Sequence, residues 1–179
     1  MTLYHALVLL PMFALLSWAA VHDVRTRRIP NLLNLILFLT GLGVSFTGMW
    51  TVSPAQAGLG ALAGFALTVP LFAIGAVGGG DVKMLTALGA WLGPTGVLLV
   101  FLARAVIGLP IVIGQAMAQG RLRVLFRNTT VLAMGAAHVG ETGIGHFAEV
   151  GKKARSVEKP LPWAVPVLVA ATWVAWLMG

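Results

Sequence analysis

The chain has 179 residues, of which 59% are hydrophobic and 9% charged, and its formal net charge is +7. Soluble domains contain roughly 45–50% apolar and about 25% charged residues, so this composition excludes an ordinary soluble protein and indicates an integral membrane protein. The absence of cysteine excludes disulfides, thiolate metal sites and a cysteine nucleophile. The four histidines lack the spacing of ligand pairs, so we expect no metal and no cofactor.

Six apolar segments follow one another along the chain, and each is a candidate for crossing a bilayer. They run from Leu3 to Val21, Leu32 to Trp50, Ala57 to Val77, Val82 to Trp91, Thr95 to Ala118 and Pro162 to Met178. The first has no basic residue before it and exceeds the apolar core of a signal peptide, so we interpret it as a retained span. Gly93 and Pro94 interrupt a run that is too long for one crossing, which favours two helices joined by a turn.

These segments lack the period-2 alternation of a barrel, and backbone in lipid must satisfy its own hydrogen bonds. The sequence therefore predicts an all-α, polytopic membrane bundle of about six helices, forming a single domain over residues 1–179. The segment 119–160 is predicted to be a cytoplasmic loop with basic ends and an apolar middle. Two interpretations of it remain open: a helix lying on the inner membrane surface, or a flexible loop.

Basic residues predict the orientation, because cytoplasmic loops accumulate Lys and Arg. They follow the first and third segments and separate the fifth from the sixth: Arg25, Arg27, Arg28, Lys83, Arg121, Arg123, Arg127, Lys152, Lys153, Arg155 and Lys159. Arg104 alone falls inside a segment, where it either snorkels to the interface or pairs within the bundle. We therefore expect both termini outside the cytoplasm. The positive charge reflects this topology and indicates no nucleic-acid partner.

Asp23 and Asp81 are the only aspartates of the chain, and each lies at the boundary of an apolar segment. The predicted topology places both on the cytoplasmic side. An ionisable residue at such a position often marks function. Asp23 also has a simpler interpretation, in which it opens an ordinary turn that ends at Pro30, is solvated, and pairs loosely with neighbouring arginines. Asn31, at the entry to the next helix, could bond to backbone or to a carboxylate.

Asp81 follows Gly78, Gly79 and Gly80. Aspartate is a favoured N-cap, so Asp81 has a simple interpretation as the cap of the next helix. A cap does not require three glycines, however, and glycines allow the backbone to approach another chain closely. This pattern is what a site that accepts an extended peptide would need. The remaining acids, Glu141, Glu149 and Glu158, show no comparable motif.

Together the two motifs resemble those of the type IV prepilin peptidases, which are membrane aspartic proteases. The resemblance rests on Asp23 with the later Ile29-Pro30-Asn31, and on Gly78 to Lys83 two segments further on. In detail, the chain is similar to the small form of these enzymes that is associated with tight-adherence (Flp-type) pili. Longer members carry paired cysteines and also methylate their product, so this cysteine-free chain gives little support for methyltransferase activity.

The resemblance implies that Asp23 and Asp81 are the catalytic pair, and that the site is shaped by Gly78, Gly79, Gly80, Lys83, Pro30 and Asn31. It implies a prepilin or pseudopilin substrate, whose basic leader is cut at the cytoplasmic face of the inner membrane beside an apolar helix. Two close carboxylates share a proton, so one can activate water while the other hydrogen-bonds the scissile carbonyl. The sequence leaves open which aspartate is the base, which pilin is cut and whether the chain forms oligomers.

Two other classes of protein compete with this interpretation. A small ion- or proton-coupled transporter would use the aspartates to carry ions, and it predicts acids near the midplane of the bilayer. A noncatalytic membrane scaffold would make the paired motifs incidental.

Overall fold

The computed structural model of the protein describes residues 3–73, 77–137 and 163–179, except for the side chains of Leu125 and residues 132–137. This part of the chain contains six α-helices and no strand: α1 (Leu3–Thr26), α2 (Asn31–Thr47), α3 (Pro54–Ala73), α4 (Gly79–Ala118), α5 (Leu122–Ala137) and α7 (Ala164–Met178). Three of them, α1, α3 and α4, are long and apolar enough to cross a membrane, and α2 and α7 are shorter apolar helices. The predicted all-α fold is confirmed.

Local sequence signals set several helix ends. Ser53 and Gln56 form a reciprocal capping box at the start of α3: the Ser53 hydroxyl accepts from the Gln56 N–H at 3.3 Å, and the Gln56 side chain accepts from the Ser53 N–H at 2.9 Å. Pro54 occupies the first position of the same helix, where proline needs no hydrogen-bond donor. Gly48 ends α2 in the left-handed conformation, with φ of 66°.

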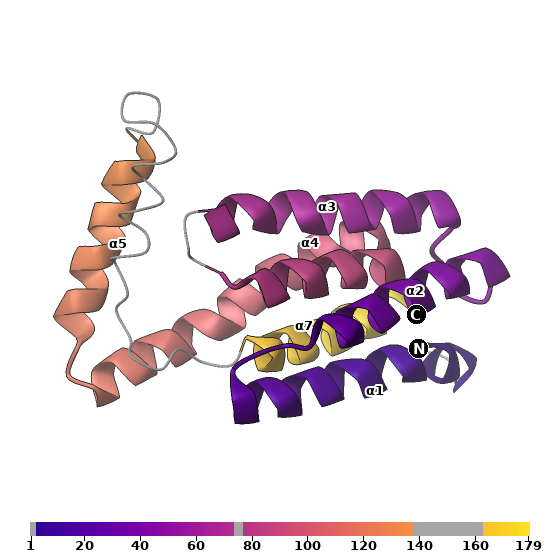
Figure 1. The fold of residues 1–179 in the computed structure, drawn as a ribbon, viewed down its shortest axis with the longest axis horizontal. Coiled ribbons are helices and arrows are strands. Elements are labelled where there is room, and N and C mark those ends of the chain that lie inside the picture. Colours follow the sequence, from indigo (N-terminus) through magenta and orange to yellow (C-terminus); the bar gives the residue numbers. More distant parts are fainter. Residues whose placement is uncertain (1–2, 74–76, 138–162) are drawn as a thin grey trace.

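Helix α4 has 40 residues and is broken at Gly93, whose φ of 67° and ψ of −176° are not helical. The chain reverses direction there, so the two halves of α4 run side by side (Figure 1). Asp81 and Arg104 interact electrostatically across this reversal. In a straight helix they would lie about 35 Å apart, at 1.5 Å per residue. The predicted division of this segment into two helices at Gly93 and Pro94 is therefore confirmed.

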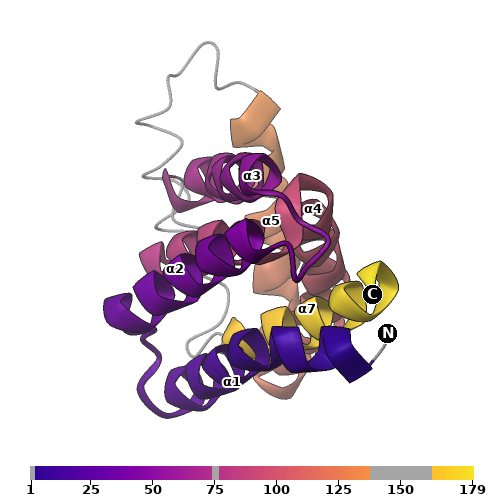
Figure 2. The ribbon, with the colours of Figure 1, turned by 90° about the vertical axis from the view of Figure 1, so that its right-hand side faces the viewer.

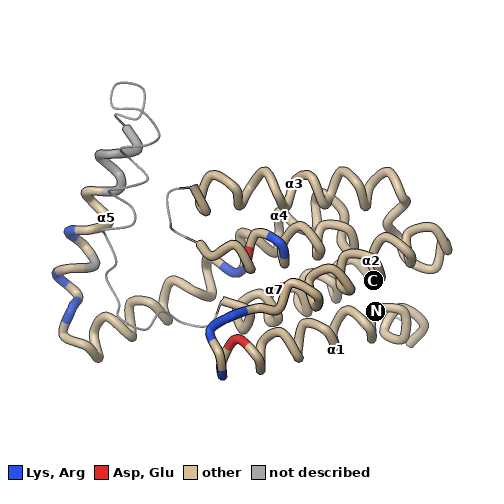
Figure 3. The backbone as a smooth tube through the Cα atoms, in the orientation of Figure 1, with Lys and Arg blue, Asp and Glu red and all other residues tan. Residues whose placement is uncertain are grey.

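With this reversal, the described helices cross the bundle six times in alternating directions. The first and last helices, α1 and α7, lie side by side, and the ends marked N and C lie together at one end of the bundle (Figures 1 and 2). The described Lys and Arg gather toward the other end and along α5 (Figure 3). The alternation of spans thus agrees with the predicted topology.

Helices α3 and α4 approach each other most closely where glycine faces glycine. A Cβ atom added to Gly60 would collide with the backbone of Gly89 and Gly93, and one added to Gly89 would collide with the backbone of Gly60. Small residues that allow such backbone contact are a common means of helix association in membranes, where lipid removes the hydrophobic driving force between helices.

Trp91, near the reversal of α4 at Gly93, is 1% exposed and joins three parts of the chain. Its indole N–H donates to the carbonyl of Leu37 at 2.8 Å, and its own carbonyl accepts from the indole N–H of Trp50 at 2.9 Å. These bonds join α2, the α2–α3 connection and α4. Buried leucines and valines of α1, α2, α4 and α7 pack around them.

Helix α5 occupies residues Leu122–Ala137 and projects beside the end of α4 (Figure 1). The first part of the segment 119–160 is therefore helical, which agrees with the interpretation of this segment as a helix rather than as a flexible loop. Residues 138–160 of that segment lie outside the described residues.

Candidate active site

Asp23 lies within α1, because the helix continues past the predicted boundary at Val21 and ends at Thr26. The prediction that Asp23 opens a turn is therefore wrong. Arg27, the first residue after the helix, has a left-handed φ of 56°, and its N–H donates to the Asp23 carbonyl at 2.8 Å. Polar residues at a membrane boundary do not stop a helix by themselves, and the chain turns only where the backbone leaves helical geometry.

The Asp23 side chain points into the bundle and is 7% exposed. Its Oδ2 accepts a hydrogen bond of 3.1 Å from the backbone N–H of Ala164, the first residue of α7. The free N–H groups at a helix start favour a carboxylate, so Asp23 caps a helix that begins far away in the sequence. The interpretation of Asp23 as a solvated loop residue is thus contradicted.

Asp81 is 5% exposed and is the third residue of α4. Its Oδ2 accepts from the N–H of Gly78, the residue before the helix, at 3.1 Å. The expectation that Asp81 is the N-cap residue is wrong by three positions: Gly78 occupies that place in an extended conformation, and Asp81 reaches back to it. This bond uses one carboxylate oxygen and fixes the direction of the side chain.

The two carboxylates come from α1 and α4 and interact electrostatically with each other. Both are buried, and each accepts one backbone N–H. Asp23 lies in the last turn of α1 and Asp81 in the first turn of α4. The structure thus buries both residues that the sequence singled out, and their role as a catalytic pair stays a prediction.

The three glycines before Asp81 have different surroundings. A Cβ atom at Gly80 would lie 3.3 Å from the Cβ of Ile29, which is tighter than ordinary contact. One at Gly79 would lie 3.5 Å from the ring of Phe72, and one at Gly78 would lie 3.4 Å from the Asp81 carboxylate. Glycine at position 80 thus lets α4 pack against the α1–α2 connection, while space for a substrate backbone at these glycines stays a prediction.

Pro30 directly precedes α2 in an extended conformation, just outside the first turn in which it was expected. Asn31 begins the helix, and its side-chain oxygen accepts from the Lys83 ammonium at 2.8 Å. The expectation that Asn31 bonds to backbone or to a carboxylate is therefore wrong. Lys83 and Asn31 instead join α2 to the first turn of α4 on an exposed surface.

Asn34 is a residue of this region that the sequence reasoning missed. It is 3% exposed, its side-chain amide donates to the carbonyl of Gly80 at 3.3 Å, and its own oxygen is buried without a partner among the described residues. Asn34 therefore supports the residue directly before Asp81. The available signal was an asparagine one helical turn after Asn31 in an otherwise apolar segment.

Arg104 is 3% exposed, so it lies inside the bundle rather than snorkelling to the interface. Its guanidinium lies near the rings of Phe101 and Trp163. In the described part of the chain, no cluster of three or more His, Asp or Glu side chains has the geometry of a metal site.

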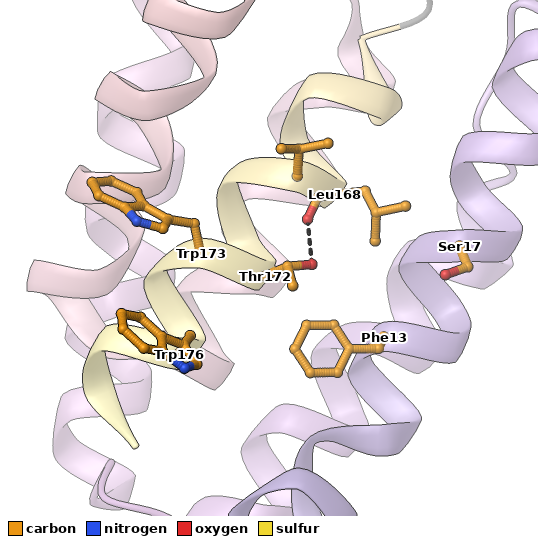
Figure 4. Close-up of a pocket in the computed structure, with 7 residues that line it drawn as sticks. Phe13, Ser17, Leu168, Thr172, Trp173 and Trp176 are labelled. Atoms are coloured by element: carbon orange, nitrogen blue, oxygen red, sulfur yellow. Dashed lines mark hydrogen bonds between the residues drawn. The ribbon is translucent and has the colours of Figure 1, made fainter. Parts of the chain in front are cut away.

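A separate apolar groove of about 680 Å³ lies between α1 and α7. It is lined by Phe13, Ser17, Leu168, Val169, Thr172, Trp173 and Trp176 (Figure 4). The Thr172 hydroxyl bonds to the Leu168 carbonyl of its own helix at 2.8 Å, so it offers no free donor to the groove. Neither aspartate lines this groove, and its apolar wall suits lipid contact rather than hydrolysis.

The fold and the site define a helical membrane protein with a buried pair of carboxylates at one end of its bundle. Residues 10–113, more than half of the chain, match the model of the type IV leader peptidase family. The chain belongs to this family. Family membership and the apolar helices together indicate a multi-pass protein of the inner membrane.

Curated relatives agree with this assignment. A prepilin leader peptidase/N-methyltransferase of Burkholderia pseudomallei (strain 1026b) is 35% identical over 139 residues, which cover 65% of this chain and 44% of that protein. One of the same name from Pectobacterium carotovorum subsp. carotovorum is 40% identical over 100 residues, covering 52% of this chain and 34% of that protein. The matched part thus spans less than half the length of these relatives. No solved structure matches the chain at comparable significance.

Proposed function

We propose that the protein is an aspartic endopeptidase that removes the basic leader of type IV or Flp-like prepilins at the cytoplasmic face of the inner membrane. The observation that carries this proposal is the burial of Asp23 and Asp81 at helix ends. They are the only aspartates of the chain, and the chain is a member of the type IV leader peptidase family. The names of the relatives support prepilins as the substrate class. The proposal includes the peptidase activity in those names and leaves out the N-methyltransferase activity.

In the proposed reaction the two carboxylates share one proton. The ionised carboxylate takes a proton from water, whose oxygen attacks the scissile carbonyl carbon, while the protonated carboxylate hydrogen-bonds the carbonyl oxygen. The tetrahedral intermediate then loses the amine, which receives a proton as the C–N bond breaks. The backbone N–H groups of Gly78 and Ala164 hold one oxygen of each carboxylate, which leaves the other oxygens to water and substrate.

The orientation is part of the proposal. Basic residues mark the cytoplasmic ends of membrane helices, and Arg25 and Lys83 lie within two residues of the two aspartates in the sequence. The substrate would present its basic leader on that side and place its apolar helix in the membrane. A transporter is less favoured, because Asp23 lies in the last turn of α1 and Asp81 in the first turn of α4, at helix ends rather than mid-span.

The test is co-expression of the chain with a pilin precursor of the same organism, with leader removal followed by gel shift and by the mass of the product. Asp23→Asn and Asp81→Asn should each abolish cleavage while the protein still inserts in the membrane. Glu158→Gln is the matched control, since it also neutralises an acid, and it should cleave normally. Processing of the precursor by either aspartate variant at the wild-type rate would falsify the proposal.

A further inference from the structure

Arg104 is buried in the second half of α4, and its guanidinium lies next to two aromatic rings. Its guanidinium carbon lies 5.0 Å from the ring centre of Phe101 and 5.5 Å from that of Trp163, distances typical of cation–π contacts. A buried guanidinium is costly in an apolar bundle unless another charge compensates it. The charge of Asp81 acts on Arg104 across the reversal at Gly93, without a close ion pair between the two side chains.

Arg104 is also incompletely bonded. Its Nη1 atom is buried and has no hydrogen-bond partner among the described residues. A residue retained only for folding would be expected to have its donors satisfied, because each unsatisfied buried donor is costly. This free donor therefore indicates a role for Arg104 beyond folding.

Trp163 connects the same arginine to the other aspartate. Its ring faces Arg104, and the next residue along the chain, Ala164, donates its backbone N–H to Asp23. Trp163 also packs against α4, since a Cβ atom at Gly108 would lie 3.5 Å from its ring. A continuous path of contacts thus runs from Arg104 through Trp163 and Ala164 to Asp23.

We propose that Arg104 and Trp163 are positioning residues that set the placement of Asp23. Trp163, held against Arg104, fixes the start of α7 and hence the N–H that orients Asp23. This inference rests on the proposed peptidase function. It assigns neither residue to contact with the substrate.

The experiment measures leader removal by purified protein in detergent, with a pilin precursor as substrate and kcat and KM determined separately. The variants are Arg104→Met, Arg104→Lys, Trp163→Leu and Trp163→Phe. A displacement of about 1 Å can cost about 100-fold in rate, so Arg104→Met and Trp163→Leu should lower kcat by about that factor and leave KM unchanged. Lys and Phe should restore part of the loss, because they keep the charge and the aromatic ring.

Arg123→Met and Trp173→Leu are the matched controls, because Arg123 is exposed and Trp173 is 53% exposed on the outside of α7. Both should retain the wild-type kcat. The double variant Arg104→Met with Trp163→Leu should be little worse than either single variant, because residues that act through one path are not additive.

The inference is overturned if Arg104→Met and Trp163→Leu keep kcat within a few-fold of wild type. A purely structural role would also overturn it. In that case Arg104→Lys and Trp163→Phe would restore no kcat, and the loss of kcat in each variant would follow the fall in its thermal unfolding temperature. Asp23→Asn and Asp81→Asn are measured in parallel. Cleavage by these two variants would reject the peptidase function itself. If they are inactive while Arg104→Met is fully active, only the positioning role is rejected.

Discussion

The Asp23 carboxylate and the backbone N–H of Ala164 form a hydrogen bond of 3.1 Å that joins α1 to the start of α7. One side chain therefore has two roles, as the cap of a helix and as a proposed member of the catalytic pair. The roles can be separated, because asparagine keeps an oxygen that accepts the same bond but cannot carry the charge.

We predict that Asp23→Asn and Asp23→Ala are equally inactive but unequally stable. The asparagine variant keeps the cap and loses only the charge at the helix start, worth a few tenths of a kcal/mol to about 1 kcal/mol. The alanine variant loses the cap as well, at a cost of about 1 kcal/mol more. Thermal unfolding in detergent, followed by circular dichroism, measures this difference. An alanine variant as stable as the asparagine variant would argue against the cap.

Two asparagines of α2 offer a matched comparison of buried and exposed polar contacts. Asn34→Leu removes the donor to the Gly80 carbonyl in a buried site, and we expect it to cost about 1–3 kcal/mol of stability and to lower kcat by displacing Asp81. Asn31→Leu removes only an exposed bond to Lys83 and should cost less than about 1 kcal/mol. Equal effects of the two substitutions on stability and kcat would contradict this account of Asn34.

The glycine contact between α3 and α4 gives a prediction about stability. Gly60→Ala places a methyl group against the backbone of Gly89 and should destabilise the protein by about 1–3 kcal/mol, as overpacking does. Gly58 lies on the same helix with open space around it, and Gly58→Ala should be neutral or stabilising by up to about 1 kcal/mol. Unfolding of both variants by denaturing detergent tests the pair, and a Gly60→Ala variant as stable as Gly58→Ala would show that the helices can separate at no cost.

The absence of cysteine makes the proposed orientation directly testable, since every introduced thiol is unique. Arg25 and Thr51 are exposed residues beyond opposite ends of α2. In intact cells with a permeable outer membrane, a maleimide that cannot cross the inner membrane should label Thr51→Cys. It should label Arg25→Cys only after the inner membrane is opened. The reverse pattern of labelling would place the aspartates on the outer side.

Hydropathy predicted the apolar helices of the bundle, because a span must be apolar over a length set by the bilayer. Turn chemistry predicted the break at Gly93 and Pro94, since few other residues adopt the backbone conformation found at Gly93. The ends of α1 were harder to predict: the helix continues through His22 and Asp23 because its polar last turn is stabilised by bonds such as that from Thr26 to the His22 carbonyl.

The candidate pair was predicted from the scarcity of aspartate and its flanking motifs, but the support around the pair was not. Asn34 contacts Gly80, and Arg104 contacts Trp163, through packing between helices. No local pattern in the sequence specifies which side of a helix faces which neighbour. The contact between Asp23 and Ala164 joins residues that are 141 positions apart. Such partners are determined by the assembled bundle rather than by any one segment.

The separation of Asp23 from Ala164 also has a consequence for the order of events during synthesis. At about 5–20 residues per second, a ribosome needs on the order of ten seconds to extend the chain by those 141 residues. During that interval Asp23 is already in the membrane but lacks the N–H group that orients it. The proposed protease would therefore be inert while nascent and would become competent only when α7 inserts beside α1.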